Sequence, residues 1–115
     1  MRLTGVMLIV AVSLLPACSD DSSGPSNCTP SATQICLTSS SFNPSTLTVG
    51  VGTTVTWRNG SGIAHTVTSD AGATESFDAD VSGSGTFTRQ FNTARSYPYH
   101  CELHSGMNGT LTVSP

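Results

Sequence analysis

From Tyr97 to Gly109 the chain reads YPYHCELHSGMNG. Cys101, His104 and Met107 stand three positions apart in this stretch, so a thiolate, an imidazole and a thioether converge on one point if the chain loops around that point. A strand-like segment enters the stretch, and a segment of alternating residues leaves it. We therefore expect a loop at one end of a β structure, and the segments around it decide what that structure is.

Segments of alternating apolar and polar residues recur upstream of this loop. In Thr53–Arg58, for example, Val55 and Trp57 share one face of the predicted strand. The chain of 115 residues also holds 18 Ser, 17 Thr and 11 Gly, a composition that disfavours helices and suits strands and turns. The other segments with strand character are Ile35–Leu37, Leu47–Val49, Ala64–Ser69, Thr86–Phe91 and Gly109–Val113. The pattern predicts an all-β Greek-key sandwich or barrel of about seven to eight strands.

Three local features complete this pattern. A turn is expected at Asn59–Gly62, where asparagine and glycine cluster. The acidic, glycine-containing stretch Asp70–Ser84 is expected to form a long irregular surface connection. Arg89 falls on the same face as Phe87 and Phe91, so we expect either a bulge there or an arginine that extends its head group to solvent.

The first residues of the chain indicate export. Residues 1–17 carry one arginine and then an apolar run, shorter than the roughly 20 residues that span a bilayer and typical of a signal segment. The run ends in Leu15-Pro16-Ala17-Cys18, which resembles the lipobox of bacterial lipoproteins. We expect a signal peptide at 1–17, a lipidated Cys18 with a flexible tether at 18–31, and the folded domain at 32–115. The alternative is an ordinary signal peptide that is cleaved nearby.

The four cysteines of the chain divide among three roles. Cys28 and Cys36 lie eight positions apart where the tether meets the first strand, and we pair them in a disulfide of the kind that persists after export. The alternatives are that both stay reduced or that one of them pairs elsewhere. With Cys18 assigned to a lipid, Cys101 is left over, and a leftover thiol in an exported protein needs a reason.

The neighbours of Cys101 supply that reason. Cysteine, histidine and methionine select copper, and one cysteine, two histidines and a distant methionine are typical of a blue-copper electron-transfer centre. The second histidine is His65, which a sandwich can bring to the same end as Cys101. Met107 is the only methionine after the signal segment. Each of these residues taken alone is more often structural, so the set as a whole carries the copper hypothesis.

The folded part resembles the cupredoxins of the plastocyanin and amicyanin type over residues 32–115. The resembling segments are FNPSTLTV from Phe42, GTTVTW from Gly52, AHTV from Ala64, GTF from Gly85, YPYHC from Tyr97 and HSGMNGT from His104. The resemblance implies one type 1 copper per chain, with three equatorial ligands and one axial ligand, namely His65, Cys101 and His104 and, in the axial place, Met107. It also implies a short ligand loop of the amicyanin kind.

Three neighbours of these ligands are notable. Thr66 stands where many relatives carry an asparagine that braces the ligand loop, and Arg89 stands where many carry an aromatic residue. His100 adjoins Cys101, but adjacent side chains of a strand point to opposite faces. We therefore expect a structural or surface role for His100 and no place among the ligands.

The resemblance implies a one-electron carrier that works between exported or membrane redox partners and is not an enzyme. The chain offers too few histidines and too little length for a multicopper oxidase. Its net charge of −3, without any lysine, argues against binding to nucleic acid. We expect a monomer that is held by its lipid anchor alone at the periplasmic or extracellular face of a bacterial membrane. Two alternatives stay open, an exported protein that stores or delivers copper and a metal-free structural sandwich.

Overall fold

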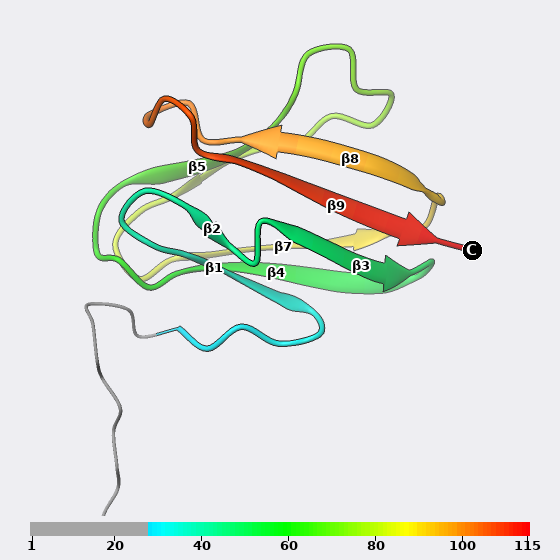
Figure 1. The fold of residues 1–115 in the computed structure, drawn as a ribbon, viewed down its shortest axis with the longest axis horizontal. Helices are drawn as coiled ribbons and strands as arrows, with labels where there is room; N and C mark the ends of the chain where they lie inside the picture. The colour runs from blue at the N-terminus through cyan, green and yellow to red at the C-terminus, as the bar shows by residue number, and fades with distance from the viewer. Residues whose placement is uncertain (1–27) are drawn as a thin grey trace, which may run out of the picture.

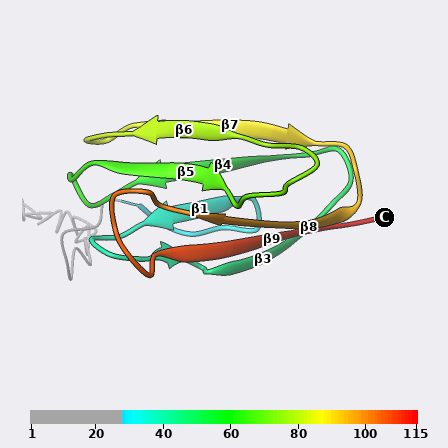
Figure 2. The same ribbon diagram turned by 90° about the horizontal axis from the view of Figure 1, so that it is seen from above.

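The computed structural model describes residues 28–115, and every regular element in that part is a strand. The strands are β1 (Gln34–Leu37), β2 (Phe42–Asn43), β3 (Thr46–Gly50), β4 (Thr53–Asn59), β5 (His65–Ser69), β6 (Asp78–Val81), β7 (Thr86–Phe91), β8 (Arg95–His100) and β9 (Asn108–Ser114). They form a four-stranded sheet in the order β2-β1-β4-β7 and a five-stranded sheet in the order β3-β9-β8-β5-β6. Figure 1 shows the two sheets as stacked layers, and Figure 2 looks onto their faces, so that the strands of one sheet overlap those of the other. The predicted all-β sandwich is confirmed, and its strands number nine among the described residues.

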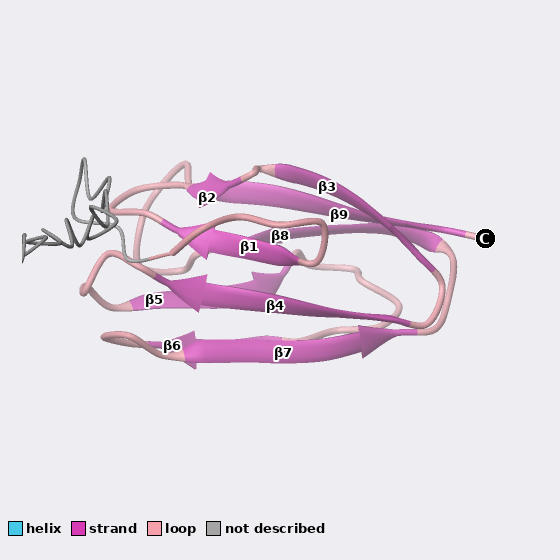
Figure 3. Ribbon diagram, turned by 90° about the horizontal axis from the view of Figure 1, so that it is seen from below, coloured by secondary structure: helices cyan, strands magenta, loops and turns pink. Residues whose placement is uncertain are grey.

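Two strand pairs are parallel, and these give the sandwich its crossed connections. β1 lies parallel to β4 in one sheet, and β3 lies parallel to β9 in the other (Figure 3). The chain changes sheets between β2 and β3, at the cis peptide bond that joins Asn43 to Pro44. Proline has no N–H for a strand ladder, so this position suits the end of one strand and the crossing to the next sheet.

The core between the sheets is centred on Trp57, whose side chain is fully buried. Four other aromatic rings have their centroids within 6.0 Å of the Trp57 ring, and these are Phe77, Phe87, Phe91 and Tyr99. Val55 is also fully buried, as the alternation of its strand predicted. Burial of each large apolar side chain stabilises the fold by about 1.5–3 kcal/mol, so this cluster is a main source of stability.

Tyr99 and Gly109 pack against each other where β8 lies beside β9. A Cβ atom on Gly109 would overlap the Tyr99 ring, which is fully buried. The close approach of the two strands therefore requires glycine at this position, immediately after the loop that carries the candidate ligands.

The stretch Asp70–Ser84 is not wholly irregular, and this expectation was wrong. Its middle forms β6, which pairs with β5 at the edge of the five-stranded sheet. Asp78 and Asp80 lie on this strand with exposed side chains, and aspartate is a poor strand former. An edge strand tolerates charged side chains that point outward. The segment therefore forms a strand although its two aspartates make a strand hard to predict from the sequence.

Arg89 causes no bulge. The pairing of β4 with β7 runs without interruption from Thr53 opposite Phe91 to Arg58 opposite Thr86. The guanidinium carbon of Arg89 lies 4.7 Å from the centroid of the Phe91 ring, and its Nη2 lies 3.9 Å from Oε1 of Glu75. Arg89 thus stays on the apolar face by stacking on aromatic rings, with its head group directed to a surface carboxylate.

The N-terminal predictions fall mainly outside the described residues. The signal segment 1–17, Cys18 and all but the last four residues of the 18–31 tether lie there. The described part begins with Cys28, which is joined by a disulfide to Cys36 of β1, with the two Cα atoms 5.7 Å apart. Within residues 28–115 there is no helix long and apolar enough to cross a membrane.

Candidate metal centre

The predicted ligands lie on two connections at one end of the sandwich. His65 is the first residue of β5, directly after the connection from β4. Cys101 follows β8 directly, and His104 and Met107 lie in the loop that leads to β9. Figure 1 shows both connections at the left-hand end of the molecule. The sandwich thus brings together residues that are distant in the sequence, as the copper hypothesis required.

The loop from Cys101 to Met107 is closed by its own main chain. The Cys101 N–H donates to the Met107 carbonyl at 2.9 Å, and the Met107 N–H donates to the His104 carbonyl at 3.2 Å. Gly106 sits inside this turn with a φ of 80°, in the left-handed region that favours glycine. The spacing of three residues between successive ligands therefore follows from a tight turn that is fixed by backbone hydrogen bonds.

Two imidazole nitrogens lie close to the thiol sulfur of Cys101. Nδ1 of His65 lies 3.7 Å from Sγ of Cys101, and Nδ1 of His104 lies 3.4 Å from it. The ligand atoms of His65, Cys101 and His104 all lie within 4.8 Å of one another. Met107 is buried beside them, tied to Cys101 and His104 through the loop bonds. These four residues are positioned for a single copper site.

Most of this site is closed to solvent. The exposed fractions are 1% for His65, 4% for Cys101 and 2% for Met107, whereas His104 is half-buried. Burial lowers the pKa of His65, and the nearby His104 lowers it further. A hydrogen bond to the Thr38 backbone acts in the opposite direction and raises it. The neutral imidazole is the form that binds a metal, so the surroundings of His65 favour the binding form.

Ser61 and Asn59 hold the His65 ring in place. The Ser61 hydroxyl donates to Oδ1 of Asn59 at 2.7 Å, and its oxygen lies 3.1 Å from Nε2 of His65. Because the single hydroxyl hydrogen points to Asn59, Ser61 accepts the Nε2–H of His65. This arrangement leaves Nδ1 of His65 as the lone-pair nitrogen and directs it toward Cys101.

Asn59 anchors the connection that carries Ser61. Its side chain is 2% exposed, and its amide nitrogen donates to the carbonyls of Ile63 at 2.6 Å and Val81 at 2.8 Å. Sequence reasoning took Asn59 and Ser61 only for turn residues and missed this role. An asparagine directly after an alternating strand and a few residues before the first histidine was the available signal.

The Cys101 sulfur also accepts a hydrogen bond from the main chain. The Thr66 N–H donates to Sγ at 3.3 Å, and Thr66 directly follows His65. Hydrogen bonds to a thiolate stabilise its negative charge. One end of β5 therefore supplies both a candidate ligand and a donor to the neighbouring ligand.

His100 takes no part in the cluster. Its Nδ1 lies 2.6 Å from Oδ1 of Asp70, and both side chains are partly exposed. The ring thus points to the opposite face of β8 from Cys101, which fits the surface role expected from strand alternation.

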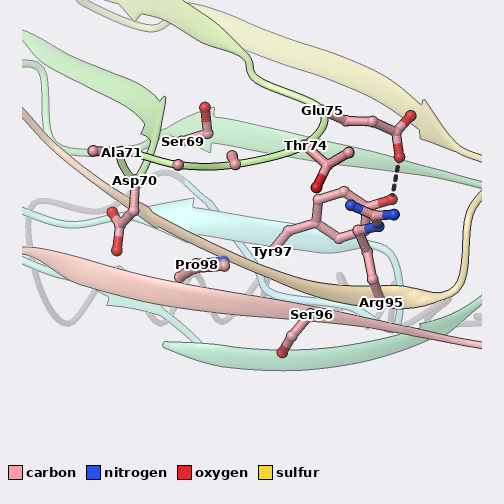
Figure 4. A pocket seen from close by; sticks show the side chains of 11 residues that line it. Ser69, Asp70, Ala71, Thr74, Glu75, Arg95, Ser96, Tyr97 and Pro98 are labelled. Atoms are coloured by element: carbon pink, nitrogen blue, oxygen red, sulfur yellow. Dashed lines mark hydrogen bonds between the residues drawn. The ribbon is translucent and has the colours of Figure 1, made fainter.

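A hollow on the surface lies between the 69–75 segment and β8, and it contains none of the four ligand residues. The Tyr97 hydroxyl lies 2.8 Å from Oε2 of Glu75 and 2.8 Å from the Thr93 carbonyl oxygen. Figure 4 marks the contact with Glu75 by a dashed line. This bond is the largest of the effects that lower the pKa of Glu75, while burial raises the pKa of Tyr97. A contact between a tyrosine and a carboxylate thus bridges the hollow, and none of the ligand residues lines it.

The donor set itself fits copper. A buried thiol, two imidazoles and a thioether are the ligands that select copper in proteins, and the hard oxygen ligands preferred by magnesium and calcium have no place among the four.

Comparison with known proteins agrees with this donor set. A family model of copper-binding proteins, the plastocyanin/azurin family, matches residues 32–114. A plastocyanin of Scenedesmus fuscus is 37% identical over 83 residues, which cover 63% of this chain and 85% of that protein. A purple cupredoxin from Nitrosopumilus maritimus superposes with a TM-score of 0.64 at 26% identity, covering 71% of this chain and 99% of that one. A reduced amicyanin variant superposes with a TM-score of 0.65 at 27% identity, covering 70% of this chain and 80% of that one. The chain therefore belongs to the plastocyanin/azurin family of copper-binding proteins, as a cupredoxin of the plastocyanin/amicyanin type.

Proposed function

We propose that this protein is a type 1 copper protein that carries single electrons between redox partners. The observation that carries the proposal is the cluster of His65, Cys101 and His104 donor atoms within 4.8 Å, closed to solvent except at His104. A copper ion bound there supplies a one-electron couple between Cu(II) and Cu(I). Plastocyanin and amicyanin relatives favour a carrier over an enzyme.

The role of the chain in this function is to hold its ligands still. His65 is held by Ser61 on the connection between β4 and β5, and Cys101 and Met107 are tied by the backbone bond between them. The loop starts directly from β8 and ends directly in β9, which are paired along their length. Ligands that keep their places in both oxidation states reduce the reorganisation that opposes electron transfer.

His104 is the expected route for the electron. It is the only one of the four ligand residues that is not buried. Two exposed apolar side chains lie on the same connections as the ligands, Leu103 at 58% exposure and Ile63 at 42%. A redox partner that approaches this end meets a half-buried imidazole on a loop that also exposes Leu103, and apolar contact with such a side chain needs no charge pairing.

The test of this proposal separates carrying electrons from delivering copper. The copper-loaded protein is cycled several times between ascorbate and ferricyanide, with a Cu(I) chelator outside a dialysis membrane. A carrier is expected to bleach and regain its blue colour with its copper retained, because three of the four ligands are buried. Loss of copper to the chelator in the reduced state would contradict the carrier and favour the delivery alternative.

We propose further that the protein is exported and anchored by a lipid on Cys18. The support is the signal-like stretch that ends at Cys18 and the disulfide between Cys28 and Cys36, a bond that persists in oxidising compartments. The test is incorporation of labelled fatty acid in bacterial cells. Wild type is expected to be labelled and to partition with membranes, whereas Cys18→Ala is expected to be unlabelled. Equal labelling of the two proteins would contradict the anchor.

A further inference from the structure

Three side-chain oxygens form a row on the face of β5 opposite to His65 and Val67. The Thr68 hydroxyl lies 3.0 Å from Oγ1 of Thr66 and 2.8 Å from Oδ1 of Asp78 on the edge strand β6. Thr68 lies opposite Asp78 in the register of these two strands. The row therefore runs from a surface carboxylate, through two threonines, toward the metal centre.

The inner end of the row reaches the ligand loop. Oγ1 of Thr66 accepts the N–H of Glu102 at 2.8 Å, and Glu102 directly follows Cys101. The Thr66 N–H in turn donates to the Cys101 sulfur at 3.3 Å. Thr66 thus holds both the sulfur and the peptide next to it, so that the orientation of Cys101 depends on where Thr66 places its hydroxyl.

The hydroxyl of Thr66 depends on Thr68 in the same way. The exposed fractions of Thr66 and Thr68 are 5% and 8%, so water has little access to either oxygen. Buried hydroxyls need partners from the protein, and Thr68 supplies one to Thr66. Thr68 has a single hydroxyl hydrogen, and Asp78 offers it an acceptor that can only accept. The position of the Thr68 side chain is therefore defined from both sides.

We propose that Thr68 and Asp78 are positioning residues of the copper site, which act on Cys101 through Thr66 and the Glu102 peptide that Thr66 holds. This inference rests on the copper site described above and goes beyond its four ligands. Groups outside the ligand set orient the ligands of protein metal sites, and their loss typically lowers metal affinity about 10- to 100-fold. In this protein the outermost of these groups lies on a different strand, at the surface of the molecule.

Asp80 provides a matched control within the same strand. It carries the same charge as Asp78, is exposed as well, and lies opposite Thr66 in the strand register. In the described part of the chain the Asp80 side chain makes no hydrogen bond to either threonine. A general effect of negative charge on the site would act from both positions, whereas an effect of the row acts from Asp78 alone.

The first experiment measures hydrogen exchange of the Glu102 amide by NMR in the purified metal-free protein. Thr68→Val removes the middle of the row at nearly constant volume, Thr68→Ser keeps its hydroxyl, and Asp78→Ala and Asp80→Ala remove one carboxylate each. We expect exchange to be about 3- to 10-fold faster in Thr68→Val and Asp78→Ala, because the brace on this amide is weakened. Thr68→Ser and Asp80→Ala are expected to exchange like wild type. Because this readout needs no metal, it judges the row even if copper binding itself fails.

The second experiment measures Cu(II) affinity by chelator competition and the position of the visible absorption band in the same variants. Thr68→Val is expected to bind copper about tenfold more weakly and to shift the band, with both properties rescued in Thr68→Ser. A merely structural role would lower stability without moving the band. The proposal is overturned if Thr68→Val and Asp78→Ala keep the wild-type exchange rate, affinity and band, or if Asp80→Ala changes them as much as Asp78→Ala does.

Discussion

The two histidines of the copper site are held in different ways. His65 belongs to a sheet half, made of Asn59, Ser61 and His65, whose side chains bond to one another. His104 belongs to a loop half, the segment Cys101–Met107, which is held mainly by main-chain bonds within a turn. The comparison teaches that one end of the site is fixed mainly by side-chain hydrogen bonds and the other mainly by backbone geometry. Substitutions in the two halves should therefore fail in different ways.

The largest effect is expected from Asn59→Ala in the sheet half. This change removes the buried amide that bonds to Ser61, Ile63 and Val81, so that each of these residues loses a hydrogen-bond partner inside the protein. Metal-free protein is expected to lose roughly 2–4 kcal/mol of unfolding free energy. The measurement is urea denaturation, with the exposed Asn92→Ala as a control that should change little. A loss below about 1 kcal/mol for Asn59→Ala would show that the sheet half is not anchored as described.

Ser61→Ala is expected to act on copper more than on folding. It removes the hydroxyl that accepts the His65 Nε2–H, so that the ring is held less firmly with Nδ1 toward Cys101. Copper affinity is expected to fall roughly 10- to 100-fold in a chelator competition. Ser105→Ala, at an exposed position of the loop half, is the matched control and should bind like wild type. Equal affinities for Ser61→Ala and wild type would remove the distinction between the two halves.

Gly106→Ala tests the loop half through its backbone. No atom lies within 4 Å of the position that a Cβ would take, so the cost comes from the φ of 80° and not from crowding. A left-handed residue with a side chain costs about 1–2 kcal/mol, which should appear as reduced stability. Gly50→Ala also meets open space but has no positive φ, and it should be close to neutral. Equal stabilities of the two variants would argue against backbone control of the ligand turn.

The effect that is smallest at neutral pH concerns β8, the strand that leads into the loop half, and it develops only at high pH. Burial raises the pKa of Tyr99 to about 12, an effect that Trp57 partly opposes. An unfolded tyrosine has a pKa of about 10, so the folded state keeps its proton where the unfolded state loses it. This contribution to stability is complete below about pH 10 and is lost as the pH rises through 12.

The titration of Tyr99 can be followed directly, because the chain has only two tyrosines. Ultraviolet absorbance of tyrosinate is expected to show a transition near pH 12 that disappears in Tyr99→Phe. The remaining transition then belongs to Tyr97. A normal transition near pH 10 for Tyr99 would mean that solvent reaches the packing beneath the ligand loop.

The ligands could be predicted from the sequence because few residue types bind copper. Cys101, His104 and Met107 follow one another at short spacing, and His65 was the only other histidine not adjacent to a candidate ligand. The alternation of Val55 with Trp57 predicted their burial for a similarly simple reason, since strand faces have a period of two.

The supports of the ligands could not be predicted in this way. Asn59 and Ser61 are common turn residues, and their role depends on which carbonyls and which ring the folded chain brings within reach. The strand that carries Asp78 was missed because local propensity opposes it, and only its pairing with β5 makes it a strand. Interactions across the sequence decide such positions, and a single sequence does not display them.

The most direct test of the central claim is a Cu(II) titration of the purified protein followed by visible spectroscopy, beside a Cys101→Ser variant. A thiolate ligand held among two imidazoles and a thioether is expected to give an intense blue colour that saturates at one copper per chain. The Cys101→Ser variant is expected to stay colourless, because it keeps the two imidazoles and the thioether but lacks the thiolate sulfur. A colourless wild type, or a variant as blue as wild type, would contradict the type 1 copper site.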